Sequence, residues 1–419
     1  MTSNGLLFVG NGGAAISAVR AARAAGYEGP IRMVADAPGE TFNPMLAPYF
    51  LAGQIPFENC FPFGRDFYTR YDVRCRFGLP LVSLDPFSRE ARLADGGILA
   101  YDRCLVATGA RPVLPRAPGI DESRYVYTLR TPEDTIRLSD AITRTRDALI
   151  IGASLVGLKM AEILLSKGAR VTLVDIADQV LPGAAHPKCA SIVEGIIRKK
   201  GVDLRLKTSL QGVEDGRKKA AFHFEGGEIL EADLCLVSIG IEPRLDFVDP
   251  SQVEIDKGII VDHMMRTSVE DLYAAGDVSQ GMNLVTGRKE IVGLWGNACY
   301  QGRTAGCNMA GGKVSYRGAV PDHVSTVFGV DFAHLGDVHP TGEENLVISD
   351  RELSGEGYRL LSFEKGVLKG ANLLNDLRIA GKLKTAIHRK FDWTGELDRL
   401  RPFPAPSVLE MILGKWIQA

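Results

Sequence analysis

The sequence lacks the features that mark metal clusters, disulfide scaffolds and membrane proteins. Its seven cysteines lie far apart and none forms a Cys-x-x-Cys pair, which argues against a zinc knuckle, an iron–sulfur cluster or a dithiol centre. No apolar run approaches the roughly 20 residues that a membrane-spanning helix needs. No basic and apolar leader precedes the first expected strand, so we predict a cytoplasmic protein whose cysteines stay reduced.

An excess of charge of either sign is also absent. The 49 basic and 51 acidic residues leave a net charge of −2, which offers no general attraction for nucleic acid or for an anionic membrane. With 45% hydrophobic and 24% charged residues, the composition is typical of a globular protein. At 419 residues the chain is too long for one ordinary core, so we expect two or three domains.

A glycine-rich turn follows the apolar run at residues 6–9. Gly10, Gly12 and Ala15 stand at the three small-residue positions of a G-x-G-x-x-A fingerprint. The first permits a sharp turn, the second lets the backbone approach a pyrophosphate, and the third lets a helix pack closely on its strand. The amides at the start of that helix would face the phosphates, and Asp36, after the next strand, could accept ribose hydroxyls.

A second fingerprint follows the apolar residues 149–151. It consists of Gly152, Ser154 and Gly157, with serine in the place of the middle glycine. Asp175 follows the next strand, and a carboxylate there binds two ribose hydroxyls and repels a 2′-phosphate. The two residues after Asp175 are apolar, so we expect NAD rather than NADP. The alternative is a dinucleotide fold retained only for packing.

The order of strand, glycine turn, helix and strand therefore occurs twice. We expect helices at residues 14–25 and 156–167, each ended by a glycine, and strands at residues 31–34 and 171–174. Alternating strands and helices predict an α/β fold with parallel sheets.

Two strand-like stretches, at residues 101–112 and 233–240, mark the expected crossovers between two nucleotide-binding domains. The chain would return to the first domain after residue 240. The region from residue 316 onward is expected to form a separate α+β unit. Its expected elements are strands at residues 358–363 and 367–371 and a helix at residues 379–390.

Two more motifs stand in order with the fingerprints. They are Ala107-Thr108-Gly109, between the fingerprints, and Thr267-Ser268 followed by residues 272–278, which contain Gly276-Asp277. With these four motifs, the chain resembles the FAD- and NAD-dependent pyridine nucleotide-disulfide oxidoreductase superfamily over roughly residues 5–380. The resemblance implies FAD on the first fingerprint, NAD on the second, and Asp277 near the ribityl chain or pyrophosphate of FAD.

The resemblance also implies domain limits and site residues. The FAD-binding domain would comprise residues 1–111 and 240–315, the NAD-binding domain residues 112–239, and a C-terminal interface domain residues 316–419. The implied FAD-binding residues are Gly10, Gly12, Gly13, Ala14, Ala15, Asp36, Ala107, Thr108, Gly109, Gly276, Asp277, Trp295 and Ala298. The implied NAD-binding residues are Gly152, Ser154, Leu155, Val156, Gly157, Asp175 and Gly240. No metal ligands are expected.

The stretch from Trp295 to Arg303 resembles the family's helix at the flavin edge. Its amino-terminal amides would face the flavin pyrimidine ring and stabilise negative charge on the reduced flavin. Trp295 would lie beside the isoalloxazine, and the alternative is a tryptophan that only fills the core. Arg130 also matches a family segment, although a surface ion pair explains it equally well.

The main departure from the family is Met45. Residues 41–50 resemble the active-site stretch of the coenzyme A-disulfide reductase and NADH oxidase branch, where a redox cysteine stands in place of Met45. Methionine cannot form a mixed disulfide or a sulfenate, so disulfide reductase and peroxidase chemistry lose their nucleophile. We expect Cys60 and Cys75, the nearest thiols in sequence, to be buried or incidental.

A second departure is Lys159, where many relatives have glutamate close to the nicotinamide. A lysine in the first turn of a helix opposes the macrodipole, which suggests a partner such as a carboxylate or the cofactor phosphates. The alternative is a solvated lysine. Because the chemistry would centre on the flavin, no catalytic residue is certain, and the candidates are Lys159, Pro48 and Trp295.

Electrons on the flavin would have no internal cysteine pair or metal site to receive them. The chain resembles NADH:rubredoxin reductases, nitrite reductase-type flavin modules, and the FAD subunits that couple anaerobic iron–sulfur enzymes to NAD, as in tungsten aldehyde oxidoreductases and phenylglyoxylate dehydrogenases. The leading hypothesis is such a subunit, which exchanges a hydride between NAD(H) and FAD and single electrons with an iron–sulfur partner. The alternatives are a free-standing NADH:rubredoxin, ferredoxin or oxygen reductase, and a non-catalytic structural flavin subunit.

Two surface features bear on partners. Lys382, Lys384, His388, Arg389 and Lys390 form a basic run, which is either a solvated helix face or a docking site for an acidic partner. The apolar tail at residues 408–417 would fold back on its own domain or dock on another subunit. Residues 316–419 could therefore mediate a homodimer or a hetero-oligomer.

Overall fold

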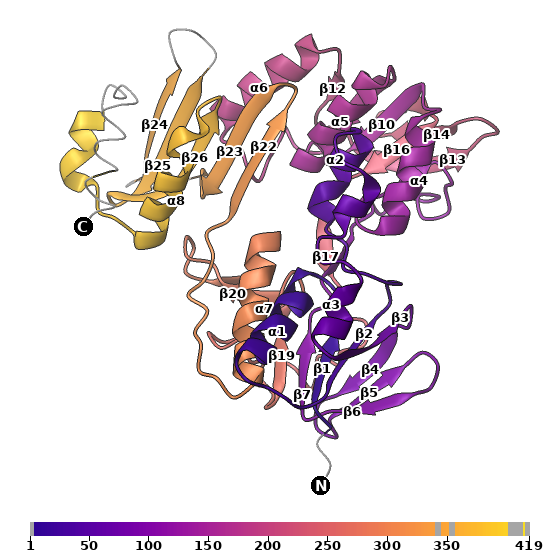
Figure 1. The fold of residues 1–419 in the computed structure, drawn as a ribbon. Helices are drawn as coiled ribbons and strands as arrows, with labels where there is room; N and C mark the ends of the chain where they lie inside the picture. Colours follow the sequence, from indigo (N-terminus) through magenta and orange to yellow (C-terminus); the bar gives the residue numbers. More distant parts are fainter. Residues whose placement is uncertain (1–3, 340–344, 352–356, 401–413, 415–419) are drawn as a thin grey trace. The chain divides into compact units, whose positions relative to one another are not determined.

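The computed structural model describes residues 4–339, 345–351, 357–400 and 414 (Figure 1). The chain divides into two compact units. The first comprises Met1–Arg111 and Ile241–Ala319, and the second comprises Pro112–Gly240 and Val320–Ala419. Each unit contains one five-stranded parallel sheet, and the second also contains a five-stranded antiparallel sheet.

The first unit is built on a parallel sheet with the strand order β19-β7-β1-β2-β3. The central strand is fully buried because all four of its residues are apolar and both sheet faces are covered. The strands are β1 (Leu6–Val9), β2 (Ile31–Ala35), β3 (Val73–Phe77), β7 (Arg103–Val106) and β19 (Leu272–Ala274).

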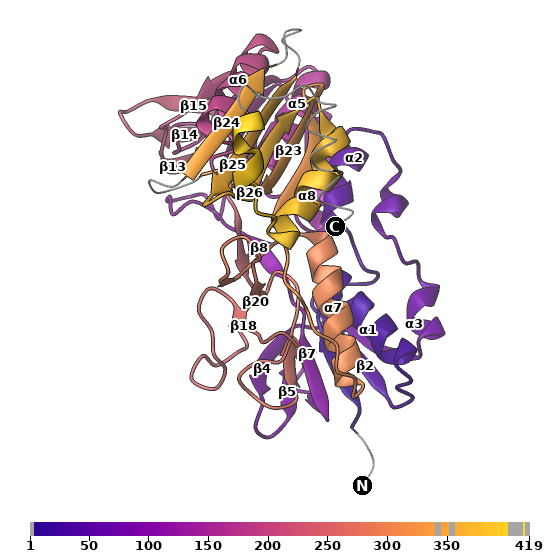
Figure 2. The ribbon, with the colours of Figure 1, turned by 90° about the vertical axis from the view of Figure 1, so that its left-hand side faces the viewer.

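Two long helices of the first unit, α1 (Gly13–Ala24) and α7 (Trp295–Met309), lie side by side (Figures 1 and 2). Small residues allow this close approach. A Cβ at Gly302 would lie 2.1 Å from the Ala14 carbonyl oxygen, and one at Gly306 would lie 2.0 Å from the Ala18 carbonyl oxygen. The helix backbones are therefore in direct contact, and the amino-terminal turn of α7 is held beside that of α1.

The second unit begins with a parallel sheet of the order β12-β11-β10-β16-β9. Its strands are β9 (Val126–Tyr127), β10 (Asp147–Ile151), β11 (Arg170–Val174), β12 (Asp203–Arg205) and β16 (Leu234–Val237). Its helices are α4 (Pro132–Ile142), which has a Thr131–Asp134 capping box, α5 (Leu155–Ser166) and α6 (Pro187–Lys199).

The rest of the second unit is an antiparallel sheet of the order β22-β23-β26-β25-β24. Helix α8 (Ala380–Arg389) packs on β23 and β26 of this sheet, and Trp393 is fully buried against Phe363. The strands are β22 (Asp322–Val327), β23 (Val330–Gly336), β24 (Asn345–Arg351), β25 (Tyr358–Glu364) and β26 (Val367–Leu374).

The remaining elements are short. In the first unit they are η1 (Pro44–Leu46), α2 (Ala47–Leu51), η2 (Phe57–Cys60), α3 (Asp66–Arg70), β4 (Leu81–Asp85), β5 (Glu90–Leu93), β6 (Ile98–Ala100), β17 (Ile241–Pro243), β18 (Ile259–Ile260), β20 (Ser279–Met282) and β21 (Lys289–Glu290), and β8 (Ala110–Pro112) ends at the boundary. In the second unit they are β13 (Leu210–Asp215), β14 (Ala220–Phe224), β15 (Ile229–Ala232), η3 (Leu377–Ile379) and η4 (Thr394–Leu400).

The α/β class and the parallel sheets are confirmed. Both fingerprint helices begin one residue before the expected start, and Gly26 and Gly168 follow them with φ of 84° and 89°. The C-terminal sheet belongs to the same compact unit as residues 112–240. The cofactor assigned to each segment stays a prediction. No helix within the described residues is long and apolar enough to cross a membrane. The apolar tail lies outside the described residues, apart from Gly414.

Candidate functional site

The turn after β1 requires glycine at its first position. Gly10 has a φ of 111°, and a Cβ there would lie only 2.2 Å from the carbonyl oxygen of Ala107. The amide of Gly10 donates to the Val34 carbonyl at 2.7 Å, and the amide of Ala107 donates to the Val9 carbonyl at 2.7 Å. The structure therefore brings the first fingerprint and the Ala107–Gly109 motif together at the carboxyl ends of neighbouring strands.

The amino terminus of α1 is open. Gly12 is its N-cap, with extended backbone, and it has no side chain to accept a hydrogen bond from the helix amides. A Cβ at Gly12 would meet no atom within 4 Å, so the approach to the helix amides is unobstructed. Unpaired amides at a helix amino terminus bind anions, and this turn fits the pyrophosphate of a dinucleotide.

Asn11, which the sequence analysis did not single out, anchors a neighbouring loop to this turn. Its side-chain amide donates to the Gly39 carbonyl at 2.8 Å. Its side-chain oxygen accepts from the Tyr68 hydroxyl at 2.8 Å and the Thr41 hydroxyl at 3.0 Å. The fingerprint thus holds the start of the segment that leads to Met45.

Asp36 lies just after β2, where a ribose-binding carboxylate is expected. One of its oxygens accepts the Ala37 amide at 2.8 Å, and the other forms an ion pair with the Nη1 of Arg244. Arg244 was not predicted, because it is more than 200 positions away in sequence and belongs to no motif.

The Gly276-Asp277 turn is held by a buried glutamine on α7. The Oε1 of Gln301 accepts the Gly276 amide at 2.7 Å and the Ser279 hydroxyl at 3.1 Å. A second buried link joins the Tyr316 hydroxyl to Asn297, at 2.8 Å, on the first turn of α7. Both links position the turn and the amino-terminal end of the same helix.

Trp295 is the first residue of α7, as the flavin-edge interpretation expects. It is half-buried, and its indole lies against Gly13, where a Cβ would approach it to 3.1 Å. Ala298 lies near Gly276 one turn further along α7. The predicted residues Gly13, Gly276, Trp295 and Ala298 therefore form one cluster in the first unit, and their contact with FAD stays a prediction.

The segment around Met45 contains no reactive thiol. Met45 lies in η1 with a relative exposure of 58%, and Pro48 begins the following short helix α2. Cys60 is fully buried, which raises the pKa of its thiol, and burial raises the pKa of Cys75 to about 11. Both thiols are therefore protonated at neutral pH and are poor nucleophiles.

The second fingerprint repeats the first turn with different local chemistry. Gly152 has a φ of 111°, and a Cβ there would lie 2.6 Å from the Ser238 carbonyl oxygen. A Cβ at Gly157 would lie 2.0 Å from the Gly152 carbonyl oxygen, so both glycines are required. Ser154 is the N-cap of α5, and its hydroxyl accepts the Gly157 amide at 3.2 Å.

The carboxylate of Asp175 is held by its own unit. It accepts the Ala153 amide at 2.7 Å and the Ala177 amide at 2.8 Å. Ala153 lies in the glycine turn, so the carboxylate lies beside the fingerprint, as a ribose-binding acid must. Ile176 is 77% exposed and offers no charge to a 2′-phosphate.

Lys159 has the kind of partner that its helix position suggested. Its ammonium donates to the Glu162 carboxylate at 2.9 Å and to the Thr326 carbonyl at 3.0 Å. The side chain is only 16% exposed. Lys159 therefore ties the fingerprint helix α5 to strand β22 within the second unit.

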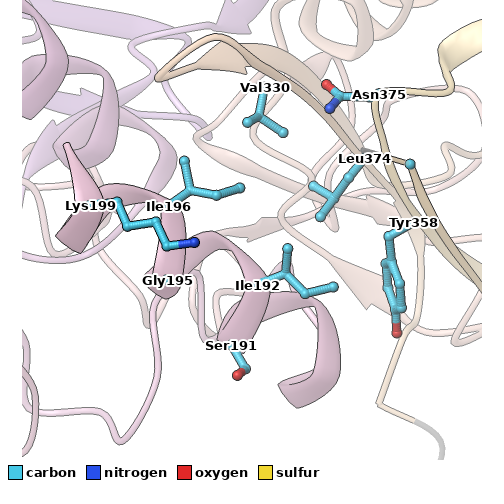
Figure 3. Close-up of a pocket in the computed structure, with 10 residues that line it drawn as sticks. Ser191, Ile192, Gly195, Ile196, Lys199, Val330, Tyr358, Leu374 and Asn375 are labelled. Carbon is cyan, nitrogen blue, oxygen red and sulfur yellow. The ribbon is translucent and has the colours of Figure 1, made fainter. Parts of the chain in front are cut away.

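Other candidate features lie away from the fingerprints. A cavity of about 440 Å³ opens between α6 and one end of the antiparallel sheet, and it contains none of the predicted site residues (Figure 3). In the basic run, Lys384 pairs with Asp322 at 2.9 Å, while His388, Arg389 and Lys390 are exposed. No cluster of potential metal ligands occurs among the described residues.

Comparison with known proteins finds a matching family and relatives that align over most of this chain. A family model described as pyridine nucleotide-disulphide oxidoreductase matches residues 5–302. The chain is 33% identical over 413 residues to the NADH-dependent phenylglyoxylate dehydrogenase subunit epsilon of Aromatoleum evansii, with 98% of this chain and 97% of that protein covered.

Two further similarities involve putidaredoxin reductase. The chain is 30% identical over 325 residues to putidaredoxin reductase of Pseudomonas putida, covering 76% of this chain and 77% of that protein. The crystal structure of the covalent putidaredoxin reductase–putidaredoxin complex matches with a TM-score of 0.90 and 25% identity, covering 99% of both chains.

Proposed function

The chain belongs to the pyridine nucleotide-disulphide oxidoreductase family, and from that premise we propose that it carries electrons between NAD(H) and an iron–sulfur protein. Members of this family that resemble the chain are FAD-dependent NAD(H) oxidoreductases, and the chain is an enzyme of that kind. When bound, FAD supplies the step that NAD(H) lacks, because a flavin takes up a hydride and releases its two electrons singly.

We assign FAD to the first unit. The open amino terminus of α1 and the unobstructed Gly12 would hold the pyrophosphate, and Asp36 would accept the adenosine ribose. Gln301 would position the Gly276-Asp277 turn, and the first turn of α7 would direct its amides toward the flavin edge. We assign NAD to the second unit, where Asp175 would orient the ribose beside the Gly152 turn.

The observation that carries the proposed electron route is Met45. The position at which the disulfide-reducing branch has its redox cysteine is occupied by an exposed thioether. Cys60 and Cys75 do not substitute for it, because burial holds both as neutral thiols. Electrons that reach the flavin would therefore leave to a separate acceptor or arrive from one.

We favour an iron–sulfur partner in a larger oxidoreductase complex over a free-standing reductase. The support is the end-to-end similarity to an NADH-dependent phenylglyoxylate dehydrogenase subunit, in which nearly all of both chains aligns. In such a complex, the partner subunits would determine the substrate and the direction of electron flow. The interface through residues 316–419 and the cytoplasmic location are part of this proposal.

A free-standing NADH:ferredoxin or rubredoxin reductase is the second candidate. It is favoured by the similarity to putidaredoxin reductase. The matching chain in the solved complex of that reductase with putidaredoxin has the same fold as this chain.

Two measurements test the proposal. Purified protein reconstituted with FAD is titrated anaerobically with NADH, and the flavin absorbance should bleach and return when ferricyanide or oxidised viologen is added. A flavin that NADH cannot bleach would leave only a structural role. Affinity purification from the native cell then separates the two candidates, because a subunit elutes with cluster-containing partners and a free-standing reductase elutes alone and active.

A further inference from the structure

We infer that Arg244 is a cofactor-retention residue that closes the adenosine end of the FAD site together with Asp36. This inference rests on the assignment of FAD to the first unit. Neither the fingerprint nor the family match singles out Arg244, which follows β17 on the segment by which the chain returns to the first unit.

The backbone of Arg244 is hydrogen-bonded to the Ala107–Gly109 motif. Its amide donates to the Gly109 carbonyl at 3.1 Å, and its carbonyl accepts the Thr108 hydroxyl at 2.9 Å. Thr108 and Gly109 belong to the motif that follows β7 beside the Gly10 turn. The position of the Arg244 Cα is therefore set by the residues that form the nucleotide edge of the sheet.

The side chain of Arg244 connects this edge to the end of β2. Its guanidinium pairs with one carboxylate oxygen of Asp36, while the other oxygen accepts the Ala37 amide at 2.8 Å. Both carboxylate oxygens are thus oriented by defined donors. The pair is partly exposed, with 32% of the arginine and 48% of the aspartate side chain accessible, so its own contribution to stability is small.

The chemistry of the pair suits an adenosine. Ribose hydroxyls donate to a carboxylate, and the guanidinium and the Ala37 amide hold that carboxylate in one orientation. The planar guanidinium can also stack on an aromatic ring such as adenine. The pair joins two separate stretches of the chain, and the backbone of Arg244 binds a third, so the pair can be complete only when the return segment is in place. We therefore assign it to holding FAD rather than to the electron transfer itself.

Arg111 provides a matched control. It lies two residues after Gly109 and pairs with Glu242 at 2.6 Å and Asp246 at 2.8 Å, on either side of Arg244 in sequence. Its side chain is 43% exposed and none of its described partners is Asp36. Arg111→Gln therefore removes two ion pairs to the same segment and leaves the Asp36–Arg244 pair in place.

The test is the affinity of the apoprotein for FAD, measured by quenching of flavin fluorescence. Arg244→Gln should weaken FAD binding at least about tenfold, as expected for loss of a charged contact worth roughly 1.5 kcal/mol or more. Arg244→Lys, which keeps the charge and loses the planar fork, should give an intermediate loss. Asp36→Asn combined with Arg244→Gln should be little worse than the poorer single variant, because both act on one contact.

Two results would overturn the inference: wild-type FAD affinity in Arg244→Gln, or an equal loss in Arg111→Gln. Far-UV circular dichroism of each apoprotein shows whether the variant is folded. If Arg244→Gln does not fold, the FAD affinity of Arg244→Lys still tests the inference. The outcome is independent of the electron-transfer proposal. A wild-type protein that binds FAD tightly but is not bleached by NADH would remove that proposal and leave the retention role standing, whereas apoprotein that binds no FAD would remove both.

Discussion

The two glycine turns of this chain share the backbone conformation of their first glycine and differ in their surroundings. Gly10 and Gly152 share a φ of 111°, and each presses against a carbonyl oxygen that follows the adjacent crossover strand. At the first turn, Gly12 leaves the amino terminus of α1 without a side-chain cap. At the second, Ser154 caps α5 with its own hydroxyl. One helix terminus needs a ligand to satisfy its amides, and the other is partly satisfied by the protein.

Asp36 and Asp175, the carboxylates that follow the second strand of each fingerprint, also differ in how far their partners lie in sequence. Asp175 is held by two amides of its own unit, one of them in the adjacent glycine turn. Asp36 depends in addition on Arg244, which arrives from a distant stretch of sequence. A site completed by distant residues suits a cofactor that stays bound, and a locally satisfied site suits a coenzyme that binds and leaves. The comparison thus supports a resident FAD on the first fingerprint and an exchanging NAD(H) on the second.

The largest expected effect comes from adding a methyl group to either glycine turn. In Gly10→Ala and Gly152→Ala, the new Cβ meets a backbone carbonyl oxygen at 2.2 Å and 2.6 Å, in a left-handed backbone region. We expect each change to cost about 3 kcal/mol or more in its own unit. Gly10→Ala should yield protein without flavin, while Gly152→Ala should retain flavin and lose NADH binding.

Flavin absorbance after gel filtration and NADH titration of the flavin measure these two outcomes. Gly26→Ala is the control, because Gly26 also has a positive φ but a Cβ there would meet no atom within 4 Å. Loss of FAD from both turn variants would show that the two sites are not independent, and loss in the reverse order would exchange the cofactor assignments.

The next effect concerns acid stability, and it distinguishes the two units. The three histidines whose pKa is lowered by burial, His186, His323 and His334, all lie in the second unit. The pKa of His334 falls to about 4 because the ring is buried and because His323 lies beside it, with the two Nδ1 atoms 3.5 Å apart. Between pH 6.5 and about 4, the unfolded chain therefore binds a proton at His334 that the folded protein does not bind.

This linkage predicts that stability falls as the pH drops from about 6.5 towards 4, by up to about 3 kcal/mol for His334. Above pH 6.5 both states are neutral at this site, so the slope vanishes there. Urea unfolding at pH 7.5, 6 and 5 measures the effect, and His334→Asn should reduce the pH dependence, leaving the contributions of His186 and His323, while the exposed His388→Gln should not change it. An unchanged slope in His334→Asn would show that other groups carry the acid sensitivity.

A smaller effect is expected from exchanging the two caps. In Gly12→Ser, the new hydroxyl can accept amides of α1 and would compete with the pyrophosphate, so we expect FAD to bind about tenfold more weakly. In Ser154→Gly, the hydroxyl bond to Gly157 is lost at a cost of a few tenths of a kcal/mol, with NADH affinity little changed. Fluorescence titrations with FAD and NADH measure both. Equal losses at the two sites would contradict the contrast between an open and a self-capped helix.

These contrasts also show which features the sequence could predict. The roles of Gly10, Gly152, Gly26 and Gly168 follow from local backbone geometry, so the strand–turn–helix units were predicted to within a residue. The cap formed by Ser154 was missed, although serine before an apolar run is an ordinary helix-start signal. The Glu162 partner of Lys159 is one helix turn away and was open to prediction, whereas its Thr326 partner was not.

The remaining site contacts could not be predicted because they join residues that only the fold brings together. Gln301 reaches Gly276 from another element, and Arg244 reaches Asp36 after 208 positions of sequence. Side chains of these types usually serve as surface or helix residues, and no spacing rule connects them. Their contribution appears only when the parallel sheet brings the carboxyl ends of β2, β7 and β19 to the same end of the sheet.

The smallest expected effect is that of Met45→Cys, which restores the residue of the disulfide-reducing branch. If electrons leave the flavin for an external acceptor, a thiol at this exposed position adds a reactive group but removes no step. NADH:ferricyanide activity should stay within about twofold of wild type, as for a surface substitution worth at most about 0.5 kcal/mol. Thiol titration should detect one additional accessible cysteine, and Met45→Leu controls for the loss of the thioether. Complete loss of activity in both variants would place the Met45 side chain against the flavin as a required packing contact. Loss in the cysteine variant alone would mean that a thiol there diverts the electrons, and the flavin site would then still have the geometry of the thiol-dependent relatives.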